Sequence, residues 1–299
     1  MISKAAQYTI QFKDSYWVIA YEAMASPCEI LVRSNDRSEA ERLASLAFSE
    51  TRRIEHTYSR YRDDNTVYRI NQSNAKPIAV DDELARLLNY ADQCYRLSDG
   101  LFDITSGVLR KAWKFDGSSV TPDTTLIESL RARVGWDEVS WDGRSLRLQP
   151  GQEIDLGGLG KEYAVDRVAE MLFQASGVSL MVNFGGDIRA IAAEDHRAPW
   201  VVGIENPRLQ NNAVGQIDLV NGGIATSGDL HRFCYIEGVR MGHILNPRTG
   251  WPVADAPRSV TVLADSSVEA GFLATLTMLQ GAHAEQFLQD QQISGHCIR

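Results

Sequence analysis

The sequence predicts a mixed α+β fold, with mixed sheets and packed helices arranged in two lobes. Two segments near the start, YWVIAYEAM and CEILVRS, are rich in β-branched and aromatic residues and predict strands. Long stretches with helical periodicity follow, and from about Leu146 the pattern changes to short strands and turns. Strands and helices do not alternate regularly, so the sequence does not predict a doubly wound parallel sheet.

Two helices are predicted between the early strands and Leu146. The segment SEAERLASLAFSETRRIEHTYSRY has apolar residues near helical spacing. The segment DDELARLLNYADQCYRLSDG is acidic at its start and closes at Gly100, which is typical of a helix. We expect one domain over residues 1–299, helix-rich over about 1–140 and strand-rich over about 141–299.

The second half is expected to contain one helix among several strands, and then a last helix. Residues Lys161–Ala175 carry an apolar stripe at helical spacing. The segments SLMVNFGGDIRAIAA, WVVGIEN and GQIDLV predict neighbouring strands. The segment RSVTVLA predicts a strand that leads into a helix over Ser266–Gly281.

The last predicted helix, SSVEAGFLATLTMLQG, contains a glycine near its middle. Ser266 and Glu269 have the spacing of a capping box, and Gly281 is a natural end. Apolar residues surround most of the circumference, which indicates a buried helix. Gly271 costs about 1 kcal/mol relative to alanine in a helix interior, so its presence needs a reason.

Composition excludes some classes of function. The formal net charge is −9, so the chain lacks the basic character that nonspecific nucleic-acid binding needs, and we expect no nucleic-acid partner. Its four cysteines are scattered without metal-like spacing, which favours reduced thiols. No apolar run is long enough for a membrane span or a signal peptide, so a cytoplasmic location is expected.

Two turns could bind phosphate. DLGGLGK, Asp155 to Lys161, leads into a helix, and its small residues, the helix N-terminus and Lys161 favour an anion. The alternative is a tight strand-to-helix turn, and this motif alone does not decide between them. IATSGD, Ile224 to Asp229, either donates hydroxyls to phosphate or forms a hydroxyl-stabilised turn.

Three further motifs have an ordinary structural interpretation. NFGGD, Asn183 to Asp187, indicates a two-glycine hairpin. In GHILNPRTG, His243 is more typical of a hydrogen-bonded structural group than of a catalyst. In DGLFDITSG, Asp103 is placed to cap the following helix.

Taken together, these motifs resemble the FAD:protein FMN transferase family over nearly the whole chain. The matching pieces are AMASPCEI, YSRYRDDNTVYRIN, DGLFDITSG, IDLGGLGKEYAVD, VNFGGDIRA, ATSGD, HILNPRTGWPV and SVTVLADSSVEAGFLAT. The resemblance implies a two-lobed flavin-transferase fold. It also implies transfer of FMN from FAD to a threonine hydroxyl of an acceptor protein, with release of AMP. Such a phosphoryl transfer is expected to use Mg²⁺.

The resemblance also implies roles for individual residues. The positions that match flavin-nucleotide contacts are Met24, Tyr61, Leu101, Phe102, Asp103, Asp155, Lys161, Thr226, Ser227 and Gly228. Of these, Lys161 is expected at the pyrophosphate. His243 is expected to assist deprotonation of the acceptor hydroxyl.

The implied magnesium site departs from the family pattern. The family uses an aspartate, a threonine four residues later, and a carbonyl of the DLGG turn. Here Thr275 and Gly158 are present, but the aspartate position is Gly271. Mg²⁺ prefers carboxylate oxygen, so this is a serious loss. A Gly271→Asp substitution is expected to rebuild the cluster with Thr275 and Gly158.

Neighbouring residues give no clear replacement for the missing aspartate. Glu269 points elsewhere on the helix, Ser267 is neutral, and Asp265 is the nearest acidic candidate. Glu162 stands where the family usually has glycine and would add negative charge beside the expected phosphate site. Three readings therefore stay open: an FMN transferase, a flavin-nucleotide-binding protein without transfer activity, and an FAD pyrophosphatase.

Overall fold

The computed structural model describes residues 8–194, 197–205, 212–230 and 232–299. The chain divides into two compact units, each assembled from three segments. The first unit comprises Met1–His56, Gly160–Thr226 and Thr261–Gly271. The second comprises Thr57–Leu159, Ser227–Val260 and Phe272–Arg299. The expectation of a single domain stays a prediction.

The first unit is built on an antiparallel sheet with strand order β1-β2-β3-β7-β8-β11. Its strands are β1 Thr9–Lys13, β2 Tyr16–Ala23, β3 Ser26–Val32, β7 Leu180–Phe184, β8 Asp187–Ile191 and β11 Gly222–Gly228. Side chains on alternate positions of β2 and β3 are buried, so one face of this sheet forms a core. A separate antiparallel pair consists of β9 Trp200–Glu205 and β10 Ala213–Leu219.

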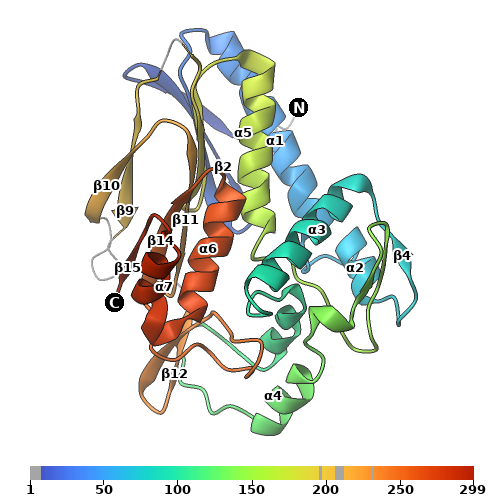
Figure 1. The fold of residues 1–299 in the computed structure, drawn as a ribbon. Coiled ribbons are helices and arrows are strands. Elements are labelled where there is room, and N and C mark those ends of the chain that lie inside the picture. The colour runs from blue at the N-terminus through green and yellow to red at the C-terminus, as the bar shows by residue number, and fades with distance from the viewer. Residues whose placement is uncertain (1–7, 195–196, 206–211, 231) are drawn as a thin grey trace. The chain divides into compact units, whose positions relative to one another are not determined.

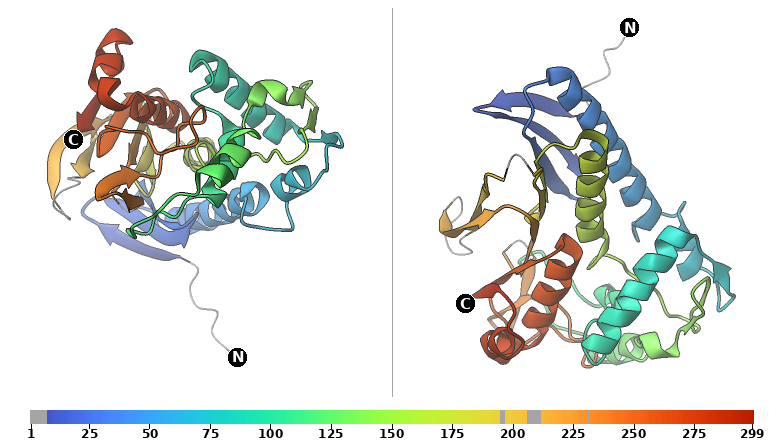
Figure 2. Two further views of the ribbon diagram at one scale, coloured as in Figure 1. Left: turned by 90° about the horizontal axis from the view of Figure 1, so that it is seen from below. Right: turned by 45° about the horizontal axis from the view of Figure 1, so that its top comes forward.

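Two long helices accompany this sheet. They are α1 Arg37–Tyr58 and α5 Gly160–Ser176, which lie side by side (Figures 1 and 2). Helix α5 packs on β7 and β8. Arg167 of α5 forms an ion pair of 3.0 Å with Glu50 of α1. These contacts fix the first turn of α5 against the β7–β8 hairpin.

The second unit contains shorter elements. Its helices are α2 Thr66–Asn71, α3 Asp82–Leu97, η1 Ile104–Lys111, α4 Thr124–Arg131, η2 Trp136–Glu138, η3 Gly281–His283 and α7 Ala284–Asp290. Its strands are β4 Ile78–Ala79, β5 Ser140–Trp141, β6 Ser145–Arg147, β12 Phe233–Ile236, β13 Val239–Gly242 and β15 Gly295–Ile298. Strands β4, β6 and β5 form one small sheet, and β12 pairs with β13. Buried leucine, isoleucine and valine side chains form its core.

Strand β14 Ser259–Ala264 and helix α6 Ser267–Leu279 continue from one unit into the other along the chain, as do the last residues of α1 and β11. The large sheet ends in the order β11-β14-β15. Helix α6 begins as the capping spacing predicted, because the Ser266 hydroxyl accepts the Glu269 N–H at 3.3 Å. Gly281, just beyond it, has φ +58°.

The predicted mixed α+β class is confirmed, and the predicted helices and strands are present. Asn206 of the predicted strand WVVGIEN lies outside the described residues. The helix expected through Tyr61 ends at Tyr58. Asn65 explains the difference, since its amide donates to the Ser59 carbonyl while its side-chain oxygen caps α2. No helix in the described part of the chain is long and apolar enough to cross a bilayer.

Candidate functional site

The first turn of α5 presents Lys161 to the β7–β8 hairpin. The hairpin turn is Gly185-Gly186, with φ values of +59° and +96° that favour glycine, so the predicted two-glycine hairpin is confirmed. Directly after it, Asp187 is buried, and its Oδ2 lies 2.8 Å from Lys161 Nζ. The backbone N–H of Thr226 also donates to the Asp187 carboxylate. Asp187 therefore joins two predicted ligand residues, Lys161 and Thr226.

Glu162, the next residue of α5, explains the glycine inside α6. A Cβ atom on Gly271 would lie 2.7 Å from Glu162 Cγ and 3.2 Å from Glu162 Oε1. Such a contact is too short for carbon atoms, so any side chain at position 271 would displace Glu162. The Glu162 carboxyl group thus fills the space that a side chain at position 271 would occupy.

Burial opposes the negative charge that Glu162 is expected to add. Burial, followed by the negative charge of Asp187, raises the pKa of Glu162 to about 8. No N–H or O–H group of the described residues donates to Glu162 Oε2. Its polar neighbour is the Asp187 carboxyl group, and a hydrogen bond between two carboxyl groups requires a proton on one of them. Burial therefore disfavours a second negative charge on this pair of carboxyl groups.

Asp166, one turn further along α5, holds the start of α6. Its two oxygens accept the N–H groups of Ser267 at 2.8 Å and Val268 at 2.9 Å. Carboxylates favour a helix N-terminus, where the first N–H groups have no partner within the helix. Burial raises the pKa of Asp166 to about 6. This contact fixes the first turn of α6. Gly271 lies about one turn further along the same helix.

Met24 occupies the turn between β2 and β3. Its φ of +53° is unusual for a side chain of this size, and its N–H donates to Glu55 Oε1 at 2.6 Å. The turn is thereby tied to α1.

In the second unit, Asp155 is bound by protein partners. Its Oδ1 accepts the Gly157 N–H at 2.9 Å, as in a tight turn before a helix. Its Oδ2 pairs with Arg60 at 2.9 Å. Arg60 also donates to the carbonyl oxygen of Gly107. A Cβ atom on Gly107 would lie 2.3 Å from Asp155 Cβ. Arg60 precedes Tyr61 in the segment YSRYRDDNTVYRIN, but no sequence pattern identified it as a site residue.

The segment Leu101–Asp103 supports the same region of the second unit. Phe102 is buried with its ring edge-on to Phe272, and a Cβ on Gly158 would rest 3.5 Å from the Phe102 ring. Asp103 caps η1 by accepting the Thr105 N–H at 2.7 Å and also accepts the Trp136 N–H at 3.1 Å. The predicted capping role of Asp103 is confirmed. Leu101 is half-buried.

Tyr61 is the most exposed of the predicted ligand residues, with 80% of its surface accessible. Its hydroxyl oxygen accepts a long hydrogen bond of 3.4 Å from Arg110. Arg110 in turn lies 3.8 Å from Asp155. An exposed aromatic ring beside an arginine can stack on a planar ring system and contact an anion.

The hydroxyl groups of Ser227 and Thr275 meet at 3.0 Å. Gly228, the residue after Ser227, allows close approach of the chain, because a Cβ there would lie 2.7 Å from the Arg258 carbonyl oxygen. The following residue, Asp229, is buried and pairs with Arg240 at 2.8 Å and Arg258 at 2.7 Å. The predicted residues Ser227, Gly228 and Thr275 therefore lie close together in the second unit.

His243 is partly buried and neutral. Burial and the positive charges of Arg110 and Arg232 lower its pKa to about 4. It hydrogen-bonds the backbone of Arg232, while no donor of the described residues reaches its Nδ1. A neutral imidazole that donates through one nitrogen keeps the other as an acceptor. His243 thus offers a free lone pair.

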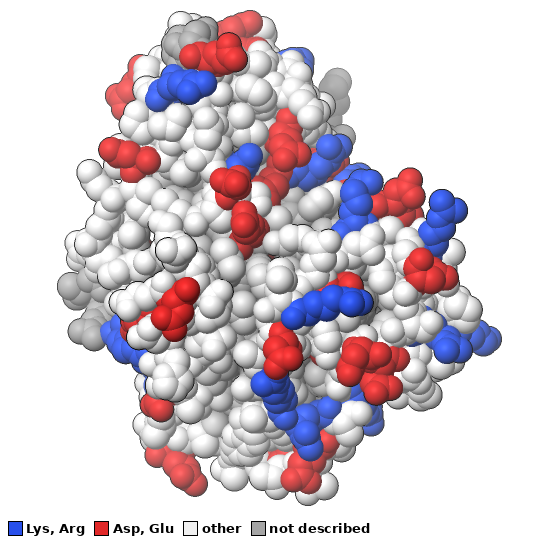
Figure 3. Space-filling model, in the orientation of Figure 1, with Lys and Arg blue, Asp and Glu red and all other residues white. Residues whose placement is uncertain are grey.

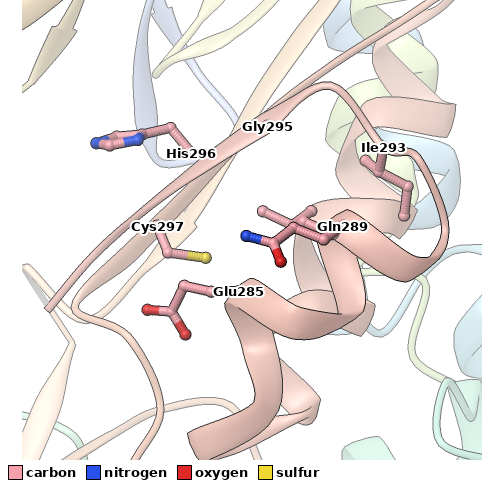
Figure 4. A pocket seen from close by; sticks show the side chains of 7 residues that line it. Glu285, Gln289, Ile293, Gly295, His296 and Cys297 are labelled. Atoms are coloured by element: carbon pink, nitrogen blue, oxygen red, sulfur yellow. The ribbon is translucent and has the colours of Figure 1, made fainter.

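The described surface has two further features, its charge distribution and a pocket near the C-terminus. On the face in Figure 3, acidic and basic side chains are interspersed, and neither sign forms a broad continuous area. A surface pocket between α7 and β15 is lined by Glu285, Gln289, His296 and Cys297 among others, and it contains no predicted site residue (Figure 4). Within the described residues, no group of three or more His, Cys, Asp or Glu side chains is arranged to hold a metal.

The fold matches that of a solved ApbE protein. The crystal structure of the ApbE protein from Thermotoga maritima matches with a TM-score of 0.84 at 29% identity, covering 94% of this chain and 93% of that one. The likeness extends to sequences of curated proteins. An FAD:protein FMN transferase of Klebsiella pneumoniae is 30% identical over 266 residues, 87% of this chain and 81% of the relative.

The family is established by two further matches. An FAD:protein FMN transferase of Vibrio cholerae is 34% identical over 230 residues, 75% of this chain and 69% of the relative. The model of the ApbE family matches residues 24–297. The chain belongs to the ApbE family.

Proposed function

We propose that this protein is an FAD:protein FMN transferase, which moves FMN from FAD to a threonine hydroxyl of an acceptor protein and releases AMP. Membership of the ApbE family supports this, because the relatives at 30% and 34% identity carry that name. The structural observation that carries the proposal is Lys161, held by Asp187 at the N-terminus of α5. A helix N-terminus with a fixed lysine suits a phosphate group.

In the proposed reaction, the acceptor oxygen forms a bond to the phosphorus of the FMN moiety. The bond from that phosphorus to the oxygen of AMP breaks, and AMP leaves with the electron pair. Lys161 offsets negative charge on the pyrophosphate. His243 receives the hydroxyl proton at its free Nδ1, which is unprotonated at neutral pH because the pKa is lowered to about 4. Nearby phosphate charge raises this pKa and strengthens the base.

Magnesium, when bound, would neutralise charge on the phosphate oxygens. The implied ligands are oxygen donors, as a hard cation requires: the Gly158 carbonyl and the Thr275 hydroxyl, which Ser227 orients at 3.0 Å. Both are neutral, so they need a carboxylate partner.

The proposal is tested by incubating the protein with FAD, Mg²⁺ and an acceptor domain that contains the target threonine. We expect the acceptor to gain the mass of FMN less one water, with AMP formed in equal amount. AMP without a modified acceptor would identify an FAD pyrophosphatase, in which water replaces threonine. Bound FAD with neither product would identify a flavin-nucleotide-binding protein, the alternative that the missing carboxylate at position 271 favours.

His243→Ala is expected to keep FAD affinity and to slow transfer about 100-fold, because it removes the proton acceptor but no charge from the neutral site. Transfer is followed by acceptor mass, and affinity by flavin fluorescence. His283→Ala is the matched control, since His283 is exposed and outside the proposed site. A His243→Ala rate equal to that of the unaltered protein would leave His243 with a structural role only.

A further inference from the structure

Glu162 and Asp187 form a buried acidic pair that carries more negative charge than its lysine balances. Both side chains are at least nine-tenths buried. Lys161 pairs with Asp187 at 2.8 Å. Two ionised carboxylates and one ammonium would leave one uncompensated negative charge in the interior, which is strongly unfavourable. A shared proton removes this charge, and a bound cation would do so as well.

The Glu162 carboxyl group has an oxygen left for such a cation. Oε2 is buried and accepts no hydrogen bond from an N–H or O–H group in the described part of the chain. Buried polar atoms without a partner are uncommon in native proteins and call for a physical reason. A buried carboxyl oxygen beside a second carboxyl group is stabilised either by a shared proton or by a positively charged ligand.

Gly271 makes this position possible. Because α6 has no side chain there, Glu162 Oε1 lies 3.2 Å from where a Cβ would stand. A carboxyl group from α5 thus occupies the space that a residue of α6 would otherwise fill. Glu162 and Gly271 are therefore complementary in volume.

Magnesium needs few carboxylate ligands from a protein when it also binds substrate phosphates. No group of three or more His, Cys, Asp or Glu side chains among the described residues forms a metal cage. Mg²⁺ rarely uses such cages in enzymes that act on phosphates. It is bound by one or two carboxylates, substrate phosphates and retained waters.

We propose that Glu162, together with Asp187, supplies the carboxylate ligands for the divalent cation in this chain, from α5 instead of from position 271 of α6. This inference rests on the proposed function, because the flavin-nucleotide phosphates complete the coordination.

The test measures Mn²⁺ binding by the loss of the free-ion electron paramagnetic resonance signal, without and with FAD. We expect Glu162→Gln to raise the dissociation constant at least about tenfold, since it removes a charged ligand but retains shape. Glu170→Gln, an exposed glutamate on the same helix, is the matched control and should bind as the unaltered protein does. Equal affinity in Glu162→Gln, or no Mn²⁺ binding by the unaltered protein in either condition, overturns the inference.

A second arm moves the carboxylate back to α6. Glu162→Ala removes Cγ and everything beyond it, which frees the space beside position 271. Glu162→Ala should bind Mn²⁺ weakly, and Glu162→Ala with Gly271→Asp should recover most of the affinity. A double variant that binds no better than Glu162→Ala contradicts a cation site at this place.

The outcome is separable from that of the transfer assay. Transfer activity with Mn²⁺ affinity insensitive to Glu162→Gln would keep the proposed function and overturn the Glu162 assignment. Mn²⁺ binding that depends on Glu162, without acceptor modification, would support the cation site and contradict the transferase proposal.

Discussion

Gly271→Asp alone is expected to lower the free energy of unfolding by about 3 kcal/mol in metal-free buffer. A Cβ at this position would lie 2.7 Å from Glu162 Cγ, and overpacking of this kind costs about 1–3 kcal/mol. The new carboxyl group would also be buried against Glu162, which adds the cost of a further uncompensated charge. Helix propensity favours the substitution by less than about 1 kcal/mol and cannot offset these terms. Urea denaturation at pH 7 with chelator measures the change.

Two control variants separate the effect of side-chain volume on stability from the effect of charge. Gly271→Ala introduces the Cβ without the carboxylate and should cost less than Gly271→Asp. Adding Glu162→Ala to either variant should recover stability, because the displaced side chain is gone. A Gly271→Asp protein as stable as the unaltered one would mean that Glu162 moves aside freely and that packing does not explain the glycine.

This expectation revises the one drawn from the sequence. Gly271 alone suggested a site that had lost its aspartate and could be rebuilt by a single substitution. The structure places Glu162 in that space, so a single substitution cannot restore the carboxylate without a clash. The contact could not be foreseen, because the two residues are far apart in the chain and no local pattern links them.

Locally determined features were predicted well. The cap at Asp103 involves an N–H two residues away, and the NFGGD hairpin is closed by its own glycines. The spacing at Ser266 and Glu269 likewise located the start of α6. Each depends on neighbours in sequence, so backbone propensities and side-chain hydrogen bonds were enough to identify it.

Long-range polar pairs were not predictable in the same way. Arg60 and Asp155 are 95 residues apart, and their ion pair occupies one oxygen of a residue expected to contact FAD. Asp187 stood inside a motif that indicated only a hairpin, and its contact with Lys161 appears once α5 packs on β8. The sequence offered one signal, a charged residue directly after a glycine turn. It did not identify the partner.

Lys161→Met is expected to destabilise the protein by about 2–3 kcal/mol at pH 8 and by much less at pH 5. Lys161 is the ion-pair partner of the buried Asp187, and removal of one partner of a buried pair leaves an unpaired charge. Methionine keeps most of the side-chain volume, so the lost stability reflects removal of the positive charge. Urea denaturation in chelator at both pH values measures it.

The pH dependence follows from the pKa values of the two carboxyl groups. Burial raises the pKa of both Glu162 and Asp187, and the Lys161 charge lowers both. A group with a raised pKa in the folded state stabilises fully below its unfolded pKa, and this stabilisation is lost as pH rises through the folded pKa. Without the ammonium both pKa values rise further. The folded variant then retains protons that the unfolded chain has released, and stability falls more steeply between pH 5 and pH 8.

Lys76→Met, at an exposed lysine, is the control and should show no such pH-dependent loss. Asp187→Asn should abolish most of the effect of Lys161→Met, because the buried charge that the lysine balances is absent. Equal destabilisation at both pH values would instead show that Lys161 contributes by packing. In that case the Lys161 ammonium at the start of α5 would be able to bind a phosphate group without a loss of folding stability.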